Sequence, residues 1–556
     1  MPIPGGPRPD HVEPRPFAGV LAHLGVPARV RQAAAGADRL AQGRAAGPGP
    51  QITGVTLSSR AVRPGDLYAA LPGSRTHGAA FAAEAAAAGA VAVLTDPSGA
   101  ERAAATGLPV AVVDDPRARL GELASWIYGE PGGKLLTLGV TGTNGKTTTT
   151  TILDAALRSA GRCTGLVGTV EWRLADERIP STGTTPESPD LHALLAVMVE
   201  RGVTTCALEV SSHALVLHRT DGLVLDVAAF TNLSQDHLDF HGTMEAYFAA
   251  KASLFTPEHA RRGVICVDDA WGAGLATSAG VPVATVAAQP GGQADWRVLA
   301  EGLDAGLPVA QVEGPGGLLV RLRSPLPGRF NLANALVALA VLVEAGVFDA
   351  ADAQAAADAL ALAGPVPGRM ERVGEPGQWG GAPLAVVDFA HSPDAVEQAL
   401  AALAGSAAPG RPLVVVLGAG GDRDREKRPL MGEAAARGAD VVVVTDDNPR
   451  SEDPVAIRAA VRAGAERASA RTGAVVVEAA GRRAAIAEGV RRAWPGGVVL
   501  VAGKGHEQGQ EVAGVIHPFD DRSALRAALL EVADEVAAET AAEAAAEAAG
   551  QQEGVR

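Results

Sequence analysis

The sequence predicts an α/β fold of three domains, and two observations support this prediction. Short runs rich in Val, Leu, Ile and Thr alternate with Ala-rich stretches of helical length, the pattern of parallel sheets covered by helices. The chain has 556 residues, 47% of them hydrophobic and 20% charged, which is enough for several globular domains and excludes extensive disorder.

The expected strands form three groups along the chain. The first group comprises 91–95 and 109–113, the second 135–141, 204–210, 227–231 and 264–267, and the third 384–387, 413–417, 440–445, 474–477 and 498–501. Segments rich in Pro and Gly at 128–133 and 364–368 separate the groups. We therefore expect domains at 49–132, 133–365 and 366–535.

Two flanking segments lie outside these domains. Residues 1–48 are rich in Pro and Gly, and we expect a flexible extension with one short helix near 28–42. Residues 536–556 form an Ala/Glu-rich tail, which is either a solvated helix or a frayed end. We expect both flanks to be dispensable.

The charge and cysteine content indicate the compartment. The formal net charge of −15 argues against nucleic-acid and anionic-membrane partners. The three cysteines contain no C-x-x-C pair, which indicates a reduced chain without a cysteine metal site. The N-terminus lacks the apolar core of a signal peptide, and no apolar run reaches the length of a bilayer span. We therefore expect a cytoplasmic protein, and a monomer.

Lysine and asparagine are rare in this chain. Each occurs only five times, whereas arginine occurs 43 times. The five lysines and five asparagines are therefore candidates for positions where an ammonium or a carboxamide cannot be replaced. They are Lys134, Lys146, Lys251, Lys427 and Lys504, with Asn144, Asn232, Asn331, Asn334 and Asn448.

The segment 139–148, G-V-T-G-T-N-G-K-T-T, predicts a phosphate-binding loop between a strand and a helix. Lys146 would contact the β- and γ-phosphates and Thr147 would bind Mg²⁺. Val140 occupies the first glycine position of the usual G-x₄-G-K-[ST] spacing. The alternative interpretation is an ordinary strand–helix turn.

Polar residues also follow two neighbouring strands of the second group. Glu209 begins E-V-S-S-H and His237 lies in N-L-S-Q-D-H-L-D, so both are candidate Mg²⁺ ligands at the edge where α/β sheets bind ligands. A solvated or capping carboxylate is the alternative for Glu209. Taken alone, His213 and His241 fit hydrogen-bonded structural histidines.

Two helices carry further candidates. Lys251 lies in an Ala/Phe/Leu helix, where a snorkelling surface lysine is the alternative to a functional one. Asn331 and Asn334 are i, i+3 neighbours able to hold an adenine edge, and a helix N-cap at Asn331 is the alternative.

The third group of strands ends in four polar clusters. The clusters are 388–394, 420–428, 446–450 and 503–507. Because carboxyl ends of parallel strands meet at one edge of a sheet, we expect these clusters to form the rim of one cleft.

Together these motifs resemble the Mur ligase family. G-T-N-G-K-T, E-V-S-S-H, N-L-S-x-D-H-L-D, G-R-F-N-x-x-N, D-x-A-H-x-P-D, G-G-D-R-D, D-N-P-R and G-K-G-H-E follow the family order over about residues 50–530. Ser58, Gln235, Phe389 and Ala419 depart from the usual residues, and none of them is a predicted metal ligand, phosphate-loop lysine or amino-acid-binding arginine.

The resemblance implies an N-terminal UDP-binding α/β domain, a central P-loop-type ATPase domain with a mostly parallel sheet, and a C-terminal Rossmann-like domain. It implies an ATP-dependent amide ligase of peptidoglycan precursor synthesis that requires Mg²⁺. This enzyme would add meso-2,6-diaminopimelate to UDP-N-acetylmuramoyl-L-alanyl-D-glutamate (UDP-MurNAc-L-Ala-D-Glu) through an acyl phosphate.

The resemblance also assigns roles to residues. It implies that ATP is bound by Gly142, Thr143, Asn144, Gly145, Lys146, Thr147, Thr148, Asn331 and Asn334. The UDP-linked substrate falls on Leu57, Ser59, Thr184, Thr185, Ser211 and Arg219, and the amino acid on Arg423, Asp447, Asn448, Arg450, Gly503 and Glu507. The implied Mg²⁺ ligands are Thr147, Glu209 and His237. The implied catalytic residues are Lys146, His213 and Lys251, and Lys251 would be modified to N6-carboxylysine.

Three other functions remain open. The chain could be a non-ligase P-loop NTPase or binding module, a folylpolyglutamate-synthetase-like ligase, or a ligase that adds L-lysine. Arg450 favours diaminopimelate, because a guanidinium binds the second carboxylate of that substrate through two parallel hydrogen bonds. A local salt bridge of Arg450 to Asp446 or Asp447 is the alternative.

Overall fold

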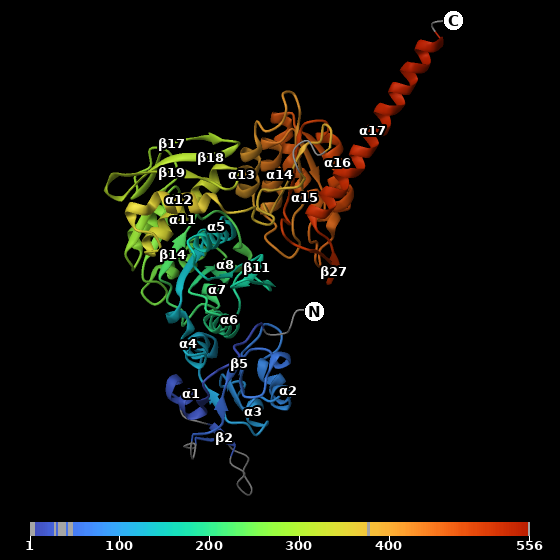
Figure 1. Ribbon diagram of the computed structural model, residues 1–556. Helices are drawn as coiled ribbons and strands as arrows, with labels where there is room; N and C mark the ends of the chain where they lie inside the picture. The colour runs from blue at the N-terminus through green and yellow to red at the C-terminus, as the bar shows by residue number, and fades with distance from the viewer. Residues whose placement is uncertain (1–5, 27–28, 32–39, 43–47, 375–378, 554–556) are drawn as a thin grey trace.

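The computed structural model describes residues 6–26, 29–31, 40–42, 48–374 and 379–553. The predicted α/β class is confirmed: three sheets of six, eleven and six strands follow one another along the chain, each covered by helices. Figure 1 shows the N-terminal domain at one end, the central domain in the middle, and the C-terminal domain beside it.

The N-terminal sheet has the order β3-β2-β8-β7-β6-β5. Its elements are β2 (Arg29–Arg31), β3 (Leu40–Gln42), β5 (Gly54–Thr56), β6 (Asp66–Ala70), β7 (Ala92–Thr95) and β8 (Val110–Val112), with α1 (Phe17–Leu24), α2 (Ala82–Ala87), α3 (Ala100–Ala104) and α4 (Pro116–Ile127). Strands β5 to β8 pair in parallel, so their carboxyl ends share one edge.

The first 48 residues differ from the expectation in two ways. A helix was expected near 28–42, but β2 and β3 form an antiparallel pair there, and part of that range lies outside the described residues. A flexible extension was also expected, but Phe17, Val20 and Leu24 of α1 are buried in the core of the N-terminal domain. In addition, β1 (Arg15–Pro16) pairs with β4 (Gln51–Ile52). Both differences come from contacts with distant strands, which override local composition.

The central sheet has the order β12-β11-β10-β13-β9-β14-β15-β16-β17-β18-β19. Its parallel strands are β9 (Leu136–Thr141), β10 (Thr164–Val167), β13 (Thr205–Glu209), β14 (Val227–Phe230), β15 (Gly263–Cys266) and β16 (Val283–Ala287). Antiparallel pairs extend both edges, through β11 (Glu171–Leu174), β12 (Glu177–Pro180), β17 (Trp296–Asp304), β18 (Leu307–Gly314) and β19 (Leu318–Arg323).

Helices cover both faces of the central sheet. On one face pack α5 (Lys146–Ser159), α11 (Arg329–Glu344) and α12 (Ala353–Ala361). Residues of α6 (Ser188–Glu200), α7 (Ser212–Val216), α9 (Met244–Ala252) and α10 (Ala270–Ser278) belong to the other core. Because β9 is central and buried on both sides, the loop that follows it lies at the carboxyl edge of the sheet, where α/β folds bind ligands.

The C-terminal sheet has the order β20-β21-β25-β22-β23-β24, parallel except for β20. Its strands are β20 (Glu371–Arg372), β21 (Leu384–Asp388), β22 (Leu413–Leu417), β23 (Val441–Val444), β24 (Val475–Glu478) and β25 (Val498–Ala502). Its helices are α13 (Pro393–Leu403), α14 (Lys427–Gly438), α15 (Pro454–Thr472), α16 (Arg482–Ala493) and α17 (Asp521–Glu553). A hairpin of β26 (Gly509–Val512) and β27 (Val515–Pro518) stands beside the sheet.

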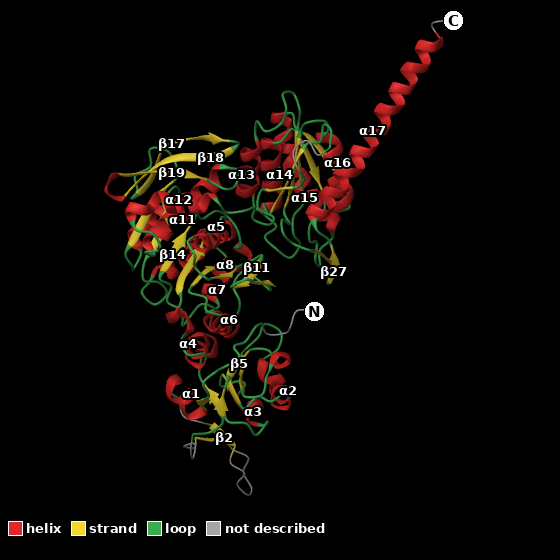
Figure 2. Ribbon diagram, in the orientation of Figure 1, coloured by secondary structure: helices red, strands yellow, loops and turns green. Residues whose placement is uncertain are grey.

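Helix α17 resolves the alternatives for the acidic tail in favour of a helix. Its first turns bury Leu525, Leu529 and Val532 in the C-terminal core, and the remainder projects away from the domain (Figures 1 and 2). Among the described residues, no helix has the length and apolar character needed to cross a membrane.

Candidate active site

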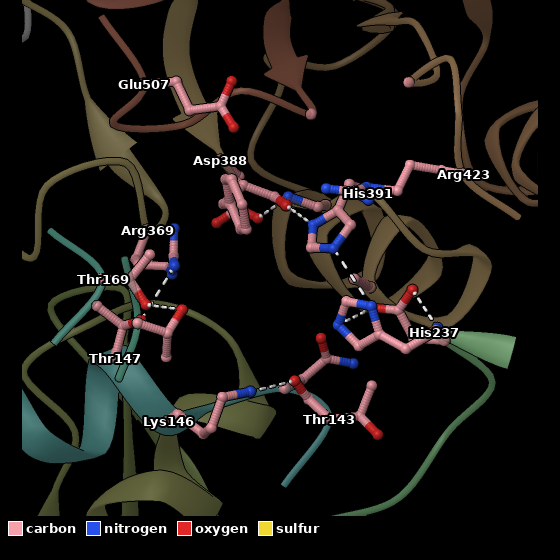
Figure 3. A pocket seen from close by; sticks show the side chains of 18 of the residues that line it. Thr143, Lys146, Thr147, Thr169, His237, Arg369, Asp388, His391, Arg423 and Glu507 are labelled. Carbon is pink, nitrogen blue, oxygen red and sulfur yellow. Dashed lines mark hydrogen bonds and ion pairs between the residues drawn. The ribbon is translucent and has the colours of Figure 1, made fainter. Parts of the chain in front are cut away.

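One cavity between the central and C-terminal domains gathers most of the predicted site residues (Figure 3). The predicted residues that line it are Thr143, Asn144, Gly145, Lys146, Thr147, Thr148, Thr184, Glu209, His237, Asn334, Arg423, Asp447, Asn448, Arg450, Gly503 and Glu507. All four polar clusters of the C-terminal sheet contribute to the lining. The structure adds residues that were assigned no role: Thr169, Asp236, Arg369, Asp388, His391 and Lys427.

The loop after β9 turns sharply into α5. Gly142 and Gly145 have φ angles of 147° and 92°, and a Cβ on Gly142 would lie 1.9 Å from the Thr231 hydroxyl oxygen, so the turn requires glycine. Val140 is fully buried in the central core, which explains why the first position of the usual spacing is apolar here. The Lys146 ammonium donates to the carbonyl oxygens of Gly142 and Thr143 at 2.8 and 2.9 Å, and burial lowers its pKa.

Glu209 lies beside the start of α5 and is buried. Its carboxylate accepts hydrogen bonds from the backbone N–H and hydroxyl of Thr169 at 2.7 and 2.9 Å, and from the Thr147 hydroxyl at 3.0 Å. The Thr147 hydroxyl in turn accepts from the Arg369 guanidinium at 3.1 Å, as Figure 3 shows.

This donor set fits a magnesium ion. Adjacent ligands of an octahedral Mg²⁺ at 2.0–2.1 Å lie roughly 3 Å apart, and the Thr147 and Glu209 oxygens are 3.0 Å apart. His237 lies across the phosphate loop, where its Nε2 is 3.5 Å from an Asp236 oxygen. Over the described part of the chain, no group of three His, Cys, Asp or Glu side chains is close enough to hold a metal by itself.

Lys251 is buried rather than snorkelling at the surface. Its ammonium donates to the same Gly142 carbonyl oxygen as Lys146, at 2.8 Å, and lies 4.6 Å from the centre of the Tyr247 ring. Burial, and then the charge of Lys146, hold the pKa of Lys251 well below its usual range.

His213 packs among aromatic rings next to the cavity. It stacks on Phe240 with ring centres 4.1 Å apart and meets His237 edge-on at 4.8 Å. Burial lowers the pKa of His213 and lowers that of His237 to about 3, so we expect both rings to be neutral at pH 7. His241 donates to or accepts from the Ser212 hydroxyl at 2.9 Å, as expected of a structural histidine.

Asp236 joins the central and C-terminal domains. Its oxygens lie 3.3 Å from the Lys427 ammonium and 3.4 Å from His391 Nε2. Burial alone would raise the pKa of Asp236, but His391 and Lys427 hold it well below its usual range. Asn144 of the phosphate loop adds a second junction by donating to the Asp394 carboxylate at 3.2 Å.

Arg450 faces the cavity from the loop after β23. It donates from Nη1 to the Gly421 carbonyl oxygen at 2.7 Å, and its Nε lies 3.4 Å from the Glu511 carboxylate. Its proposed local partners are engaged elsewhere: Asp446 pairs with Arg458, and Asp447 lies 4.0 Å from Arg482. The alternative of a local salt bridge to Asp446 or Asp447 is therefore wrong.

The asparagine pair on α11 lies at the junction of two cavities. Helix α11 has Gly328 as its N-cap, so the alternative of an N-cap at Asn331 is wrong. Asn331 is buried outside the lining and accepts from Asn334 at 3.1 Å, whereas Asn334 lines both the main cavity and a neighbouring one. Asn331 therefore orients Asn334.

The residues predicted for the UDP-linked substrate lie in two places. Thr185, Ser211 and Arg219 form one network, in which the Thr185 hydroxyl accepts from Ser211 N–H at 3.1 Å and Arg219 donates to the Thr185 carbonyl at 3.2 Å. Thr184 connects this network to the cavity. Leu57 and Ser59 lie outside the cavity, in the N-terminal domain, so the structure does not bring the whole set together.

Sequence reasoning missed the residues that cross between domains. Arg369 follows the Pro/Gly-rich segment and Asp236 precedes His237, yet neither position carries a local signal for its partner. Lysine scarcity pointed to Lys427 without indicating a role.

Family models match all three domains. "Mur ligase family, catalytic domain" matches residues 51–128, "Mur ligase middle domain" matches 140–342, and "Mur ligase, glutamate ligase domain" matches 368–505.

Similar proteins extend the match to nearly the whole chain. The UDP-N-acetylmuramoyl-L-alanyl-D-glutamate–2,6-diaminopimelate ligase of Streptomyces avermitilis is 54% identical and covers 95% of this chain and 99% of its own. The UDP-N-acetylmuramyl-tripeptide synthetase of Leifsonia xyli is 46% identical with the same coverage. A solved structure of a UDP-N-acetylmuramoyl-L-alanyl-D-glutamate–2,6-diaminopimelate ligase shares 34% identity at a TM-score of 0.59, covering 86% of this chain and 95% of its own. At this identity over nearly its full length, the chain belongs to the Mur ligase family.

Proposed function

We propose that the chain is the ATP-dependent ligase that joins meso-diaminopimelate to UDP-MurNAc-L-Ala-D-Glu in peptidoglycan precursor synthesis. The observation that carries the proposal is the single cavity, which has the phosphate loop on one wall and the Arg450 loop on the other. The names of the relatives from Streptomyces and of the 34% identical structure support it.

The reaction has two steps in this cavity. An oxygen of the D-glutamate side-chain carboxylate attacks the γ-phosphorus of ATP, so that an acyl phosphate forms and ADP leaves. The amine of diaminopimelate then attacks the acyl carbon, and the tetrahedral intermediate collapses with loss of phosphate and a proton. Lys146 and the N-terminus of α5 stabilise the negative charge of the transferring phosphoryl group.

Thr147 and Glu209 would hold Mg²⁺, which supplies Lewis-acid stabilisation of the phosphates when bound. Arg369 donates to Thr147 and so orients the hydroxyl that would hold the ion. His237, neutral at pH 7, has a ring nitrogen able to serve as a ligand on the opposite side of the phosphate loop.

Lys251 is proposed to act as N6-carboxylysine. Carbamylation requires an unprotonated amine, and the burial of Lys251 beside Lys146 favours that form. The nitrogen of the neutral amine forms a bond to the carbon of CO₂ and loses a proton, which converts a neutral group into an anion. The anion would lie near Lys146 and offset its charge.

The adenine of ATP is proposed to lie in the cavity next to the phosphate loop, where Asn334, Asn232 and Phe330 line the wall. Asn331 acts there through Asn334. Since both ATP and nucleotide-linked precursors are cytoplasmic metabolites, we infer that the protein works in the cytoplasm. We further propose a monomer, and the net charge of −15 supports the expectation of no nucleic-acid or anionic-membrane partner.

The choice of amino acid is decided by Arg450. The distal end of diaminopimelate carries a carboxylate that lysine lacks, and Arg450, whose guanidinium is held by the Gly421 carbonyl oxygen, lines the cavity. Lysine would instead bring an alkyl ammonium beside that guanidinium. The tripeptide synthetase name of the Leifsonia relative leaves the amino acid open, so the experiment must compare the two.

The test is phosphate release with UDP-MurNAc-L-Ala-D-Glu, ATP and Mg²⁺, with either meso-diaminopimelate or L-lysine. We expect kcat/KM to favour diaminopimelate by more than 100-fold, a difference of about 3 kcal/mol, and Arg450→Ala to lose most of that preference. Equal turnover of both amino acids by the wild type contradicts the diaminopimelate assignment. Hydrolysis that is independent of either amino acid contradicts the ligase itself and favours the NTPase.

A further inference from the structure

Lys504 is a buried cation directly behind the amino-acid-binding loops. It follows β25, and its side chain is fully enclosed. Its ammonium lies 3.0 Å from the Asn448 carboxamide oxygen and 2.8 Å from a Glu507 carboxylate oxygen. Asn448 also donates to the same Glu507 oxygen at 2.8 Å. Lys504 does not itself line the cavity, whereas Asn448 and Glu507 do.

This arrangement fixes the orientation of Asn448. Its carboxamide oxygen accepts from Lys504 and from the Glu511 backbone N–H at 3.0 Å, so its NH₂ group must point toward Glu507. Two acceptor contacts and one donor contact leave a single orientation of the amide.

The same contact changes what Glu507 presents to a ligand. A lone carboxylate attracts any ammonium, but Glu507 already faces the ammonium of Lys504. The side chain of Glu507 is about one-third exposed toward the cavity, while its partner is enclosed. Because the Lys504 side chain is enclosed, its ammonium stays beside Glu507 and offsets the negative charge of that carboxylate.

We propose that Lys504 is a positioning residue that sets the selectivity of this site for a zwitterionic amino-acid end over a simple ammonium end. With Glu507 offset, an ammonium end such as that of L-lysine gains little there and also meets the Arg450 guanidinium. A zwitterionic end gains from Arg450 through its carboxylate and places its ammonium between Glu507 and that carboxylate. Selectivity is a difference between two affinities. Lys504 weakens the ammonium contact of both ligands, but its charge also attracts the carboxylate of the zwitterionic end, so it lowers the affinity for the simple ammonium end more.

Arg450 is held in place by contacts with Glu511 of β26. Its backbone N–H donates to the Glu511 carbonyl at 3.0 Å, and its Nε lies 3.4 Å from the Glu511 carboxylate. The charged groups around the predicted end pocket therefore include the cations Lys504 and Arg450 and the anions Glu507 and Glu511, and Arg423 and Asp447 also line the cavity. Behind them, Arg482 pairs with Asp521 and lies 4.0 Å from Asp447.

The inference rests on the proposed function, and its test uses the full-length enzyme. Lys504→Gln removes the charge and keeps a donor for Asn448, whereas Lys504→Arg keeps the charge. The measured quantity is the ratio of kcat/KM for meso-diaminopimelate to that for L-lysine. The control is Lys134→Gln at an exposed lysine before β9, which should leave the ratio unchanged.

We expect Lys504→Gln to lower the ratio at least tenfold, with KM for ATP and for the UDP-linked substrate within twofold of wild type. Lys504→Arg should keep the ratio within threefold. A purely structural role would raise both amino-acid KM values together without changing the ratio, and that result overturns the inference. If Lys504→Arg lowers the ratio of the two kcat/KM values as much as is expected for Lys504→Gln, the inference is also overturned. This second measurement is possible even if the glutamine variant does not fold. A wild type without preference contradicts the proposed function instead.

Discussion

Two lysines meet at one backbone oxygen in the phosphate loop. The ammonium groups of Lys146 and Lys251 both lie 2.8 Å from the Gly142 carbonyl oxygen. Two like charges this close in a buried site disfavour double protonation, and the fully enclosed Lys251 is the one whose pKa falls furthest below its usual range. The lowered pKa of Lys251 favours its neutral amine, the form that carbamylation requires, whereas Lys146 is the proposed cation for phosphate.

The first prediction concerns the cation. Lys146→Ala should lower the rate of amide formation by about 10²-fold or more, because a preorganised charge at the transferring phosphoryl group is lost. Affinity for the UDP-linked substrate should be nearly unchanged. The measurements are turnover by phosphate release and substrate affinity by calorimetry, with Lys134→Ala as the control. Turnover within tenfold of wild type would show that the loop has another role.

The second prediction concerns the amine. Lys251→Ala should be nearly inactive if the lysine acts as a carbamate, and short carboxylic acids should restore part of the activity by occupying the vacated space with an anion. Activity is measured over a titration of acetate or formate. An alanine variant with wild-type turnover and wild-type Mg²⁺ dependence would reduce Lys251 to a packing residue.

At the level of elements, the parallel strands were predictable and the edge strands were not. The strands at 135–141 and 498–501 are apolar runs buried on both faces, and the structure has β9 and β25 there. By contrast, β17 has the sequence W-R-V-L-A-E-G-L-D, and its residues are mostly exposed after the first three. Its strand form depends on antiparallel pairing with β18, which local composition does not reveal.

The candidate site divides in the same way. Motif residues such as Lys146 and Asn448 were predictable because their chemistry is local to one loop. The ion pair of Asp236 with Lys427 joins positions 191 residues apart, and each is a single polar residue without a periodic pattern. Such pairs are fixed by how domains dock, so only the structure shows them.

The third prediction belongs to helix α6. His192 is fully buried there, with Nε2 2.9 Å from the Asp221 carbonyl oxygen, and burial lowers its pKa to about 4. In the unfolded chain this ring takes up a proton near pH 6.5, but in the folded protein only near pH 4. Its contribution to stability is therefore present above pH 6.5 and is lost as the pH falls from there toward 4, about 2 kcal/mol between pH 7 and pH 5.

The measurement is the midpoint of thermal unfolding at pH 7 and pH 5. We expect the wild type to lose more stability than His192→Gln over this interval, while the exposed His11→Gln behaves like wild type. An identical pH dependence in wild type and His192→Gln would mean that other groups control acid unfolding.

At the scale of the whole molecule, the active-site cavity is also the contact between two domains. Asn144 of the phosphate loop bonds Asp394, and Arg369 from the start of the C-terminal domain bonds Thr147. The residues that would hold ATP are thus the same ones that hold the domains in register. Catalytic geometry therefore depends on domain docking as much as on either domain alone.

The N-terminal domain is fixed to the central domain by a different device. The segment before α1 runs between them: Arg8 donates to Asp66 of β6 at 2.6 Å, and both side chains are buried. Two residues further on, the backbone N–H groups of Asp10 and His11 donate to the Glu200 carboxylate at the end of α6, at 3.0 and 2.8 Å. These contacts argue against the expectation that this flank is dispensable, and deletion of the segment tests it.

The last prediction follows from this segment. Arg8→Met leaves the Asp66 carboxylate buried without its partner, which should cost about 3–5 kcal/mol and lower the midpoint of thermal unfolding. Glu200→Gln weakens only an exposed anchor and should cost far less. The control is Arg158→Met, which removes a surface pair with Asp176 and should shift the midpoint little.

Because the Arg8 segment sets how the N-terminal domain faces the cavity, we also expect deletion of residues 1–14 to raise KM for the UDP-linked substrate more than KM for ATP. A deletion variant with wild-type stability and both KM values unchanged would show that the segment only lies across the interface and does not hold it.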